Sequence, residues 1–240
     1  MMKRTKRRFA VCFAALLLLF AAWTVSAAAE KTVYLDAAHG SDRADGTSAS
    51  APLASLDAAF AAVRDGGRIV LLSDYTIRAH YTEPQHDGEV VITAADGGKS
   101  TGAKLVFDVA GETHYRLSGA TTFRDLDITL GNFVMFTAQF HSLTFDTGLS
   151  VENGEKYAFV IGGYQTAFPE DMELGLDSHV TIKSGKYHAV AGSSRGASSI
   201  MFEGTSHITV DGGEINMLFG GSINGSGMAN AEITINGGTI

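Results

Sequence analysis

The sequence predicts an all-β fold, a parallel β-helix built from stacked coils. The prediction rests first on a phrase that occurs three times near the C-terminus: SHVTIKSGKYHAVAGSS, SHITVDGGEINMLFGGS and AEITINGGTI. Val180, Ile208 and Ile233 occupy the same slot, so successive copies are 28 and 25 residues apart. Repeats of this length indicate supersecondary units that stack to bury a common core.

The second observation is the alternation of apolar and polar residues within each copy. Val180 and Ile182 point to one side of an extended chain, and Thr181 and Lys183 point to the other. This pattern is typical of a strand with one buried face. Corners that contain glycine follow each strand, because glycine accepts positive φ at no steric cost. These corners are Ser184-Gly185, Gly212-Gly213 and Gly237-Gly238.

Further short runs complete each repeat. Residues 187–191 follow the first corner, and residues 199–202 precede the second copy. Three short strands and three corners describe one coil of a parallel β-helix. A helical-hairpin solenoid is disfavoured because no 3.6-residue periodicity is present. The hexapeptide and calcium-binding β-rolls are disfavoured because their short fixed periods are absent.

An earlier coil is expected before the three copies. Residues 149–154 match 180–185 at an offset of 31, and residues 160–163 match 190–193 at an offset of 30.

Residues 1–29 are expected to be a secretory signal peptide. Five basic residues precede a 15-residue apolar run from Phe9 to Trp23, and cleavage is expected after Ala27 or Ala29. The alternative is an uncleaved anchor, although the run is shorter than the roughly 20 residues of a membrane span. Residues 30–240 are then one β-helix domain, with 30–78 as N-terminal cap and first coil and 79–240 as successive coils.

Charge and cysteine content narrow the function classes. The full chain has 18 basic and 26 acidic residues, and removal of the five basic residues in 1–29 changes the net charge from −8 to −13. This balance disfavours nucleic acid and anionic membranes as partners and suits a secreted or extracellular surface protein, or one that binds cations. Cleavage also removes Cys12, the only cysteine, so neither disulfide nor thiol chemistry is expected.

The C-terminal end also carries an expectation. Ile240 follows a glycine corner in mid-phrase, without the capping element that covers the edge strand of a solenoid. We therefore expect a β-helix truncated at its C-terminus, whose next neighbours are further coils of the same full-length chain.

The N-terminal region predicts a cap. Leu56, Ala59, Phe60 and Val63 fall on one face of a helix, and Ser55 is a good N-cap. Strands are expected before and after this helix, at residues 32–35, 68–72 and 75–77. Such a helix beside an exposed strand edge protects that edge from pairing with other chains.

The segment VYLDAAHGSDRADGTSASAPLASLDAAFAAVRDGGRIVLLSDYTI resembles the N-terminal part of the pectin-lyase-like superfamily of right-handed parallel β-helix proteins. The matching elements include Asp45-Gly46-Thr47, Pro52-Leu53 and residues 66–70. The resemblance implies a right-handed β-helix in which the helix covers the open first coil. It implies no single activity, because the superfamily includes lyases, hydrolases, adhesins and phage tailspikes.

Strands are expected to follow steadily after residue 89. The expected strands are residues 90–92, 104–108, 114–117, 122–128, 133–136 and 142–145. Phenylalanine is dense in this part, which indicates inward aromatic stacking by Phe133, Phe136, Phe140 and Phe145. Phe123, Leu126 and Ile128 are expected to face the core.

Two groups of acidic residues are candidate functional sites, one for Ca²⁺ binding and one for catalysis. Asp36, Asp42 and Asp45, with His39 among them, offer oxygen ligands for Ca²⁺, although Asp side chains that cap turns explain the same pattern. Arg124, Asp125 and Asp127 are candidate catalytic residues, since the resemblance implies lyases with Asp-bound Ca²⁺ and a basic residue. Outward polar positions on a strand are the favoured alternative, because the hydrolase signatures Asn-Thr-Asp, Gly-His-Gly and Arg-Ile-Lys are absent.

His179 and His207 occupy the same outward slot in successive copies, and Glu232 fills it in the third. Coils that stack in register would align these three side chains on one face, and Zn²⁺ accepts such ligands. The alternative is an outward ladder with no bound metal.

The loops that follow the second corner of each coil are expected to line one side of the stack. They carry candidate glycan-binding residues, with a tyrosine as stacking platform: Tyr164, Glu170, Asp171, Arg195 and Asn224. The alternative is a row of surface turns without a function.

Two functions from different classes remain. The first is a non-catalytic stalk or adhesin-like module that binds a polysaccharide, such as a host or cell-wall glycan. The second is a polysaccharide lyase or glycoside hydrolase of the pectin-lyase-like fold. An enzyme requires carboxylates and a basic residue that converge on one face, whereas a stalk has scattered charge.

Overall fold

The computed structural model of the chain describes residues 30–152, 158–165 and 173–240. The expected signal peptide, residues 1–29, lies outside them. The described part is almost entirely β-structure, with a single short helix among the described residues, and from Lys31 onward it belongs to one compact unit. No helix in this part of the chain is long and apolar enough to cross a membrane.

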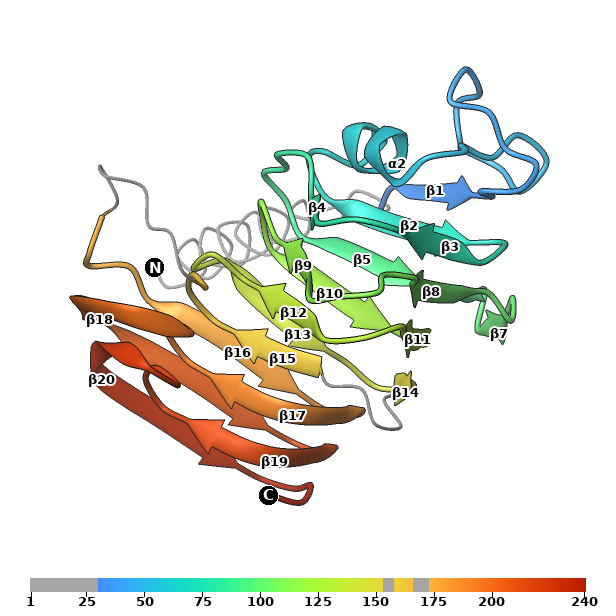
Figure 1. The fold of residues 1–240 in the computed structure, drawn as a ribbon. Coiled ribbons are helices and arrows are strands. Elements are labelled where there is room, and N and C mark those ends of the chain that lie inside the picture. Colours follow the sequence, from blue (N-terminus) through green and yellow to red (C-terminus); the bar gives the residue numbers. More distant parts are fainter. Residues whose placement is uncertain (1–29, 153–157, 166–172) are drawn as a thin grey trace, which may run out of the picture. The chain divides into compact units, whose positions relative to one another are not determined.

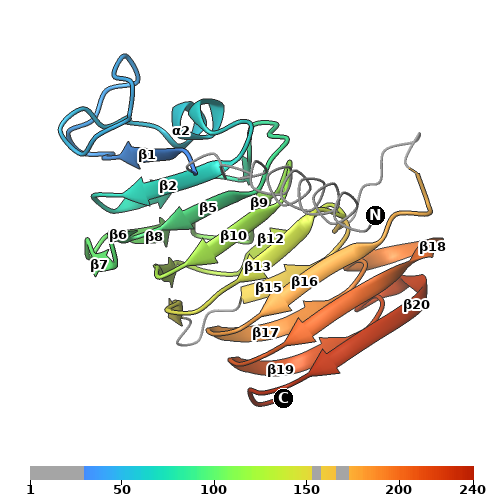
Figure 2. The same ribbon diagram turned by 180° about the vertical axis from the view of Figure 1, so that it is seen from behind.

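Nearly all strands belong to three parallel sheets, which we call A, B and C (Figures 1 and 2). Sheet A contains β1 (Thr32–Leu35), β2 (Gly67–Leu71), β5 (Val90–Thr93), β10 (Thr121–Arg124), β13 (Ser142–Phe145), β16 (Ser178–Ile182), β18 (Gly196–Val210) and β20 (Gly225–Ile235). Sheet B contains β3 (Tyr75–Ile77), β8 (Lys104–Phe107), β11 (Asp127–Leu130) and β14 (Ser150–Glu152). Sheet C contains β4 (Tyr81–Thr82), β9 (Thr113–Arg116), β12 (Val134–Thr137), β15 (Ala158–Ile161), β17 (Lys186–Ala191) and β19 (Glu214–Phe219).

The chain visits the sheets in a fixed order. From β2 to β15 it passes through A, then B, then C, and each strand pairs in parallel with its equivalent one coil later. A short antiparallel pair, β6 (Ala95–Asp96) with β7 (Lys99–Ser100), projects from the corner after β5. This arrangement is consistent with a parallel β-helix, as the repeat predicted.

The last coils are simpler than the sequence predicted. From β16 on, the chain passes directly from sheet A to sheet C without a strand in sheet B. The expected separate run at residues 199–202 is instead continuous with the next copy of the phrase in the 15-residue strand β18. Its pairing with β20 is interrupted by register shifts. Coils with three strands are therefore found from β2 to β15, whereas the C-terminal repeat from β16 on has coils with two strands.

The register of the repeat is confirmed. Val180 pairs with Ile208, and Ile208 pairs with Ile233. The first two are 1% exposed, while Ile233 on β20 is 42% exposed, because β20 is the last strand of sheet A. At the corner, Gly213 has a φ of +82°, and a Cβ there would lie 2.9 Å from the Gly185 carbonyl oxygen, so the stacked corners require glycine.

The earlier coil was predicted in the wrong register. The offset of 31 placed Val151 opposite Ile182, but Ile182 pairs with Phe145 of β13. Val151 lies in sheet B, where it pairs with Ile128. The offset of 30 between Val160 and Val190 in sheet C is confirmed. The first error arose because LSVENG and VTIKSG show the same alternation although they belong to different sheets.

The strand predicted over residues 122–128 is interrupted at a corner. Asp125 has a φ of +46° and turns the chain from β10 in sheet A to β11 in sheet B. Its amide donates to the Thr147 carbonyl (3.0 Å) and its carbonyl accepts from the Ala94 amide (3.0 Å), so this corner stacks on those of neighbouring coils. Asp tolerates the left-handed region better than most residues, which allows the corner without glycine.

An aromatic stack fills the centre of the coils. Phe136 packs against Phe107, Phe123 and Phe145, with ring centroids 5.1 to 5.7 Å apart. The prediction that Phe133 also faces inward was wrong, since its side chain is 38% exposed and stacks on Phe159 outside the core. Val134 takes the inward position, because the alternation in β12 starts one residue later than expected.

The N-terminal cap has the predicted form. The helix α2 (Leu56–Ala62) lies beside β1, the first strand of sheet A. Ser55 caps it by accepting a hydrogen bond from the Ala58 amide (3.1 Å). Leu56 and Phe60 are fully buried against the first coil.

Phe136→Ala is expected to lower the free energy of unfolding by about 3 to 5 kcal/mol, because it leaves a cavity in the aromatic stack. The matched control is Phe133→Ala, which removes the same atoms from a partly exposed position and is expected to cost less than about 1 kcal/mol. Urea denaturation followed by circular dichroism measures both. Equal losses for the two variants would show that the inward and outward assignments of β12 are wrong.

Candidate functional site

The acidic N-terminal loop uses its carboxylates to hold its own backbone. Asp36 accepts hydrogen bonds from the Ala38 amide (3.0 Å) and the Ser73 hydroxyl (2.7 Å), and its other carboxylate oxygen lies 3.3 Å from His39. Asp42 accepts from the amides of Ala54 and Ser55, and Asp45 accepts from the amide and hydroxyl of Thr47. Each carboxylate thus serves a different turn.

The candidate catalytic residues also have separate partners. The Arg124 guanidinium pairs with Asp146 (2.6 Å), and Asp127 lies 4.0 Å from the Lys104 ammonium. Asp125 and Asp127 line a hollow of about 180 Å³ next to Gly148. The basic residue expected to act with them, Arg124, is thus bound to a different carboxylate.

Asp146 is the centre of a charge clamp across three coils. It is buried on β13's C-terminal side, and it pairs with Arg124 of β10 and with Lys183, which directly follows β16 (3.1 Å). Burial raises the pKa of Asp146, but hydrogen bonds from the Thr147 amide, Arg124 and Lys183 outweigh burial and place the pKa below its ordinary value.

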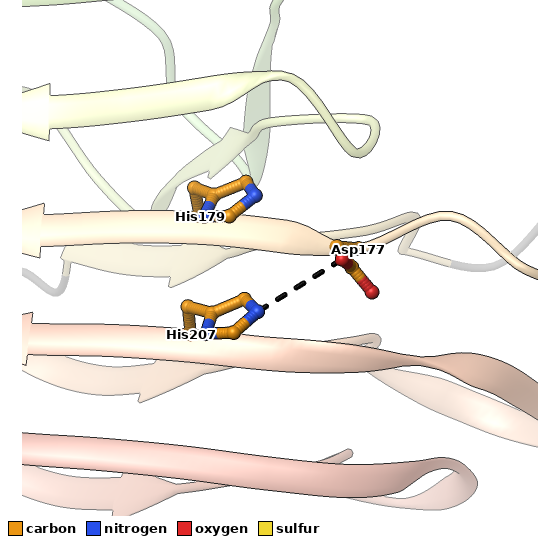
Figure 3. Close-up of side chains that lie close together, drawn as sticks. All are labelled: Asp177, His179 and His207. Atoms are coloured by element: carbon orange, nitrogen blue, oxygen red, sulfur yellow. Dashed lines mark ion pairs between the residues drawn. The ribbon is translucent and has the colours of Figure 1, made fainter.

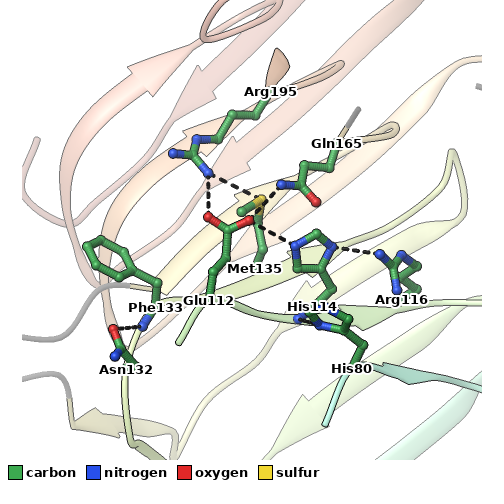
Figure 4. A network of polar contacts seen from close by, with 9 residues as sticks. All are labelled: His80, Glu112, His114, Arg116, Asn132, Phe133, Met135, Gln165 and Arg195. Carbon is green, nitrogen blue, oxygen red and sulfur yellow. Dashed lines mark hydrogen bonds and ion pairs between the residues drawn. The ribbon is translucent and has the colours of Figure 1, made fainter. Parts of the chain in front are cut away.

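A second polar network lies on the outer face of sheet C and is centred on Glu112 (Figure 4). The Glu112 carboxylate accepts hydrogen bonds from His114 Nε2 (2.9 Å), Gln165 Nε2 (2.8 Å) and Arg195 Nη1 (3.3 Å). Gln165 and Arg195 come from loops that follow β15 and β17, whereas Glu112 directly precedes β9, so side chains from three different coils meet at one carboxylate. Burial raises the pKa of Glu112, but these three donors outweigh it and lower the pKa.

The protonation of His114 follows from its neighbours. Arg116 Nη2 donates to Nδ1 (2.7 Å), while Nε2 faces the Glu112 carboxylate. Burial lowers the pKa of His114, and the nearby Arg116 and His80 lower it further, although Glu112 opposes them. The ring is therefore neutral at pH 7, with its proton on Nε2.

Aromatic rings adjoin this network. The Arg195 guanidinium lies 4.7 Å from the centre of the Phe159 ring, a cation–π contact. Phe133 stacks on Phe159, with ring centroids 6.3 Å apart, and its own ring is partly exposed near Glu112 (Figure 4). The patch formed by Glu112, His114, Phe133, Gln165 and Arg195, which we call the Glu112 patch, thus combines planar polar groups with an aromatic surface.

The loop residues predicted to bind glycans have different positions. Arg195 belongs to the Glu112 patch, whereas Tyr164 is half-buried and its ring packs beside Phe140 (5.9 Å). Asn224 is exposed in the next loop, where its amide donates to the Ser222 hydroxyl (3.2 Å). Glu170 and Asp171 lie outside the described residues. The loops do stack as expected, since the Ser194 hydroxyl donates to that of Ser222 (3.0 Å).

The histidine ladder is the third cluster (Figure 3). His179 pairs with His207 across β16 and β18, and their rings are parallel with centroids 4.8 Å apart. Glu232 on β20 pairs with His207, and one carboxylate oxygen lies 3.0 Å from His207 Nδ1. Asp177 adjoins both histidines. Among the described residues, Asp177, His179 and His207 are the only three potential metal ligands found close together.

Asp146, Glu112 and Asp177 were missed because each lies outside the alternating part of a strand. Asp146 and Asp177 flank strands of sheet A, and Glu112 immediately precedes β9. The sequence does offer one signal that could have added Asp177 to the predicted metal ligands. Asp177 lies two residues before His179, at the start of the repeated phrase.

No protein-family model matches the chain, and comparison with curated proteins and with solved structures finds no match.

Asp146→Asn is expected to lower the free energy of unfolding by about 1 to 2 kcal/mol at pH 7, since it weakens two charged hydrogen bonds to partly exposed partners. Because the folded state lowers the pKa of Asp146, the stabilisation is full above the unfolded pKa and is lost as the pH falls through the folded pKa. The difference between the two proteins should therefore shrink below a pH of about 4.

Denaturant titrations at pH 7 and at low pH test this expectation. Asp108→Asn is the control, because Asp108 forms an exposed pair with Arg78 (3.8 Å) and little change is expected. A stability difference for Asp146→Asn that is the same at both pH values would contradict the clamp.

Proposed function

We propose that the chain is an exported right-handed parallel β-helix of the pectin-lyase-like kind, which acts as a non-catalytic secreted or cell-surface module and binds a polysaccharide. The parallel sheets and the N-terminal helix beside β1 support the class. The pattern of basic, apolar and small residues in 1–29 supports export.

The separate pairing of charges supports a non-catalytic role. A lyase needs a base placed beside a carboxylate that holds Ca²⁺ or the substrate, and a glycosidase needs two carboxyl groups across the scissile bond. Arg124 is bound to Asp146, Asp127 faces Lys104, and Asp125 forms a corner. Catalysis at these residues would first require the clamp at Asp146 to open.

The Glu112 patch is the observation that carries the binding proposal. A sugar ring has apolar C–H faces that pack on aromatic rings, and hydroxyl groups that both donate and accept hydrogen bonds. Phe133 supplies an aromatic surface that is 38% exposed, and Glu112, Gln165 and Arg195 supply acceptors and donors with fixed geometry. Mutual hydrogen bonds hold these side chains in place, so less conformational entropy is lost when a ligand binds.

The position of the patch also suits a long polymer. The outer face of sheet C presents equivalent positions of successive coils roughly 4.8 Å apart, so neighbouring sugars can contact neighbouring coils. Sugar hydroxyls can share Glu112 and Gln165, while Arg195 also suits the carboxylate of a uronic acid. The proposed ligand is therefore a polysaccharide, either neutral or uronate-containing.

Affinity electrophoresis of the full chain in gels that contain xylan or polygalacturonate tests the proposal. Retardation is expected in at least one of these gels. Phe133→Ala and Glu112→Ala should each weaken retention about tenfold, the equivalent of roughly 1.4 kcal/mol per substitution. Asp108→Asn, which removes the charge of an exposed carboxylate paired with Arg78 and not with any residue of the patch, should leave retention unchanged.

Two results would contradict the proposal. One is the absence of retardation by either polysaccharide, or retardation that Phe133→Ala and Glu112→Ala leave intact. The other is the release of unsaturated oligosaccharides from polygalacturonate in the presence of Ca²⁺, which would establish lyase activity.

A further inference from the structure

We infer that Asp177, His179 and His207 form a binding site for a borderline transition-metal ion, Zn²⁺ being the expected ion, on the outer face of sheet A. Glu232 is a positioning residue for this site. The inference does not depend on polysaccharide binding, since none of these residues belongs to the Glu112 patch.

The register of the sheet brings the two imidazoles together. His179 and His207 are direct partners across β16 and β18, and an angle of 3° between the rings places both in the same orientation. One potential ligand atom from each of Asp177, His179 and His207 lies within 4.8 Å of the others. Two histidine nitrogens and a carboxylate oxygen are a common three-ligand set for zinc, with water as the fourth ligand.

Glu232 determines which nitrogen of His207 faces the site. Its carboxylate oxygen lies 3.0 Å from Nδ1, which favours the tautomer of the neutral ring that has its proton on Nδ1 and its lone pair on Nε2. His207 Nε2 points toward Asp177, 3.9 Å from Oδ2 (Figure 3). A carboxylate that orients a ligating histidine in this way is the usual outer partner in zinc sites and increases the basicity of the ligand.

Asp177 is held from the neighbouring coil. Its Oδ1 accepts a hydrogen bond from the Thr205 amide (2.6 Å), which leaves Oδ2 directed at the histidines. The backbone of β18 thus fixes a carboxylate that directly precedes β16, and the two histidines lie on paired strands. The ligand atoms lie within 4.8 Å of one another, and the side chains would rotate to reach the closer spacing around a metal ion.

The donor set selects the class of metal. Imidazole nitrogen suits Zn²⁺, Ni²⁺, Cu²⁺ and Co²⁺, whereas Ca²⁺ and Mg²⁺ prefer oxygen ligands alone. Access is open, because the His207 side chain is 33% exposed and that of Asp177 is 50% exposed. A bound ion would join the segment before β16 to β18 and would stabilise the folded state through its affinity for that state.

Isothermal titration of the full chain, without a polyhistidine tag, with ZnCl₂ at pH 7.5 tests the site. One equivalent of Zn²⁺ is expected to bind, and Co²⁺ should give the visible absorption of a four-coordinate site. His179→Ala and His207→Ala should each weaken binding at least about tenfold, and Glu232→Gln should weaken it by about 10-fold or more through the orientation of His207. His39→Ala, at an exposed histidine of the N-terminal loop, is the matched control and should bind as tightly as the unmodified chain.

Thermal unfolding with and without Zn²⁺ gives a second measurement. The unmodified chain and Glu232→Gln should both be folded, and the rise in Tm on Zn²⁺ addition should be larger for the unmodified chain. The proposal is overturned if Zn²⁺ does not bind, or if it binds to His179→Ala and His207→Ala as tightly as to the unmodified chain. It is also overturned if His39→Ala reduces binding as much as His207→Ala does. CaCl₂ that competes fully with Zn²⁺ would also overturn the donor assignment.

Discussion

The structure depends on the in-register stacking of parallel strands from successive coils. Except for the short β6–β7 pair, every pairing between named strands in the described part of the chain is parallel, and each strand faces its equivalent in the next coil. A residue that points inward in one coil is therefore covered by an inward residue of the next, and the same holds outside. The apolar inward ladders drive the stacking, because each coil alone cannot bury its apolar side.

The same constraint creates the surface clusters. Once the core sets the register, outward residues at equivalent positions are brought within contact distance. The pairing of Val180 with Ile208 in the core also places His179 opposite His207 on the outer face, where the two rings stack. In the same way, Arg124 and Lys183 reach Asp146 from the coils on either side of it. The Glu112 patch follows the same logic with loops, since Gln165 and Arg195 leave sheet C at neighbouring coils. Clusters of polar side chains on the outside of this fold therefore follow from the register of the strands.

The repeat made much of the fold predictable. Near-identical phrases specify their own register, so Val180, Ile208 and Ile233 could be aligned from the letters alone, and Ser55 with the apolar face from Leu56 specified the helix. Alternation without a repeated phrase was a weaker guide. Alternation does not show to which sheet a strand belongs, so Val151 was predicted in the wrong sheet. It also does not predict a corner formed by an aspartate with positive φ, such as Asp125. Partners contributed by corners and loops, such as Asp177 and Glu112, follow no periodic pattern, so only the folded chain brings them to their sites.

Disulfide trapping tests the register most directly. In a Cys12→Ser background, Thr181→Cys with Thr209→Cys places the two cysteines on direct outward partners of β16 and β18. Their Cα atoms, one strand spacing apart, lie within the roughly 4.4 to 6.8 Å that a disulfide requires, whereas Thr181→Cys with Asp211→Cys is shifted by two residues and lies beyond about 7 Å. The account predicts rapid, complete cross-linking of the first pair and little of the second. Equal cross-linking of both pairs, or preferential cross-linking of the shifted pair, would contradict in-register stacking and with it the placement of the histidine ladder.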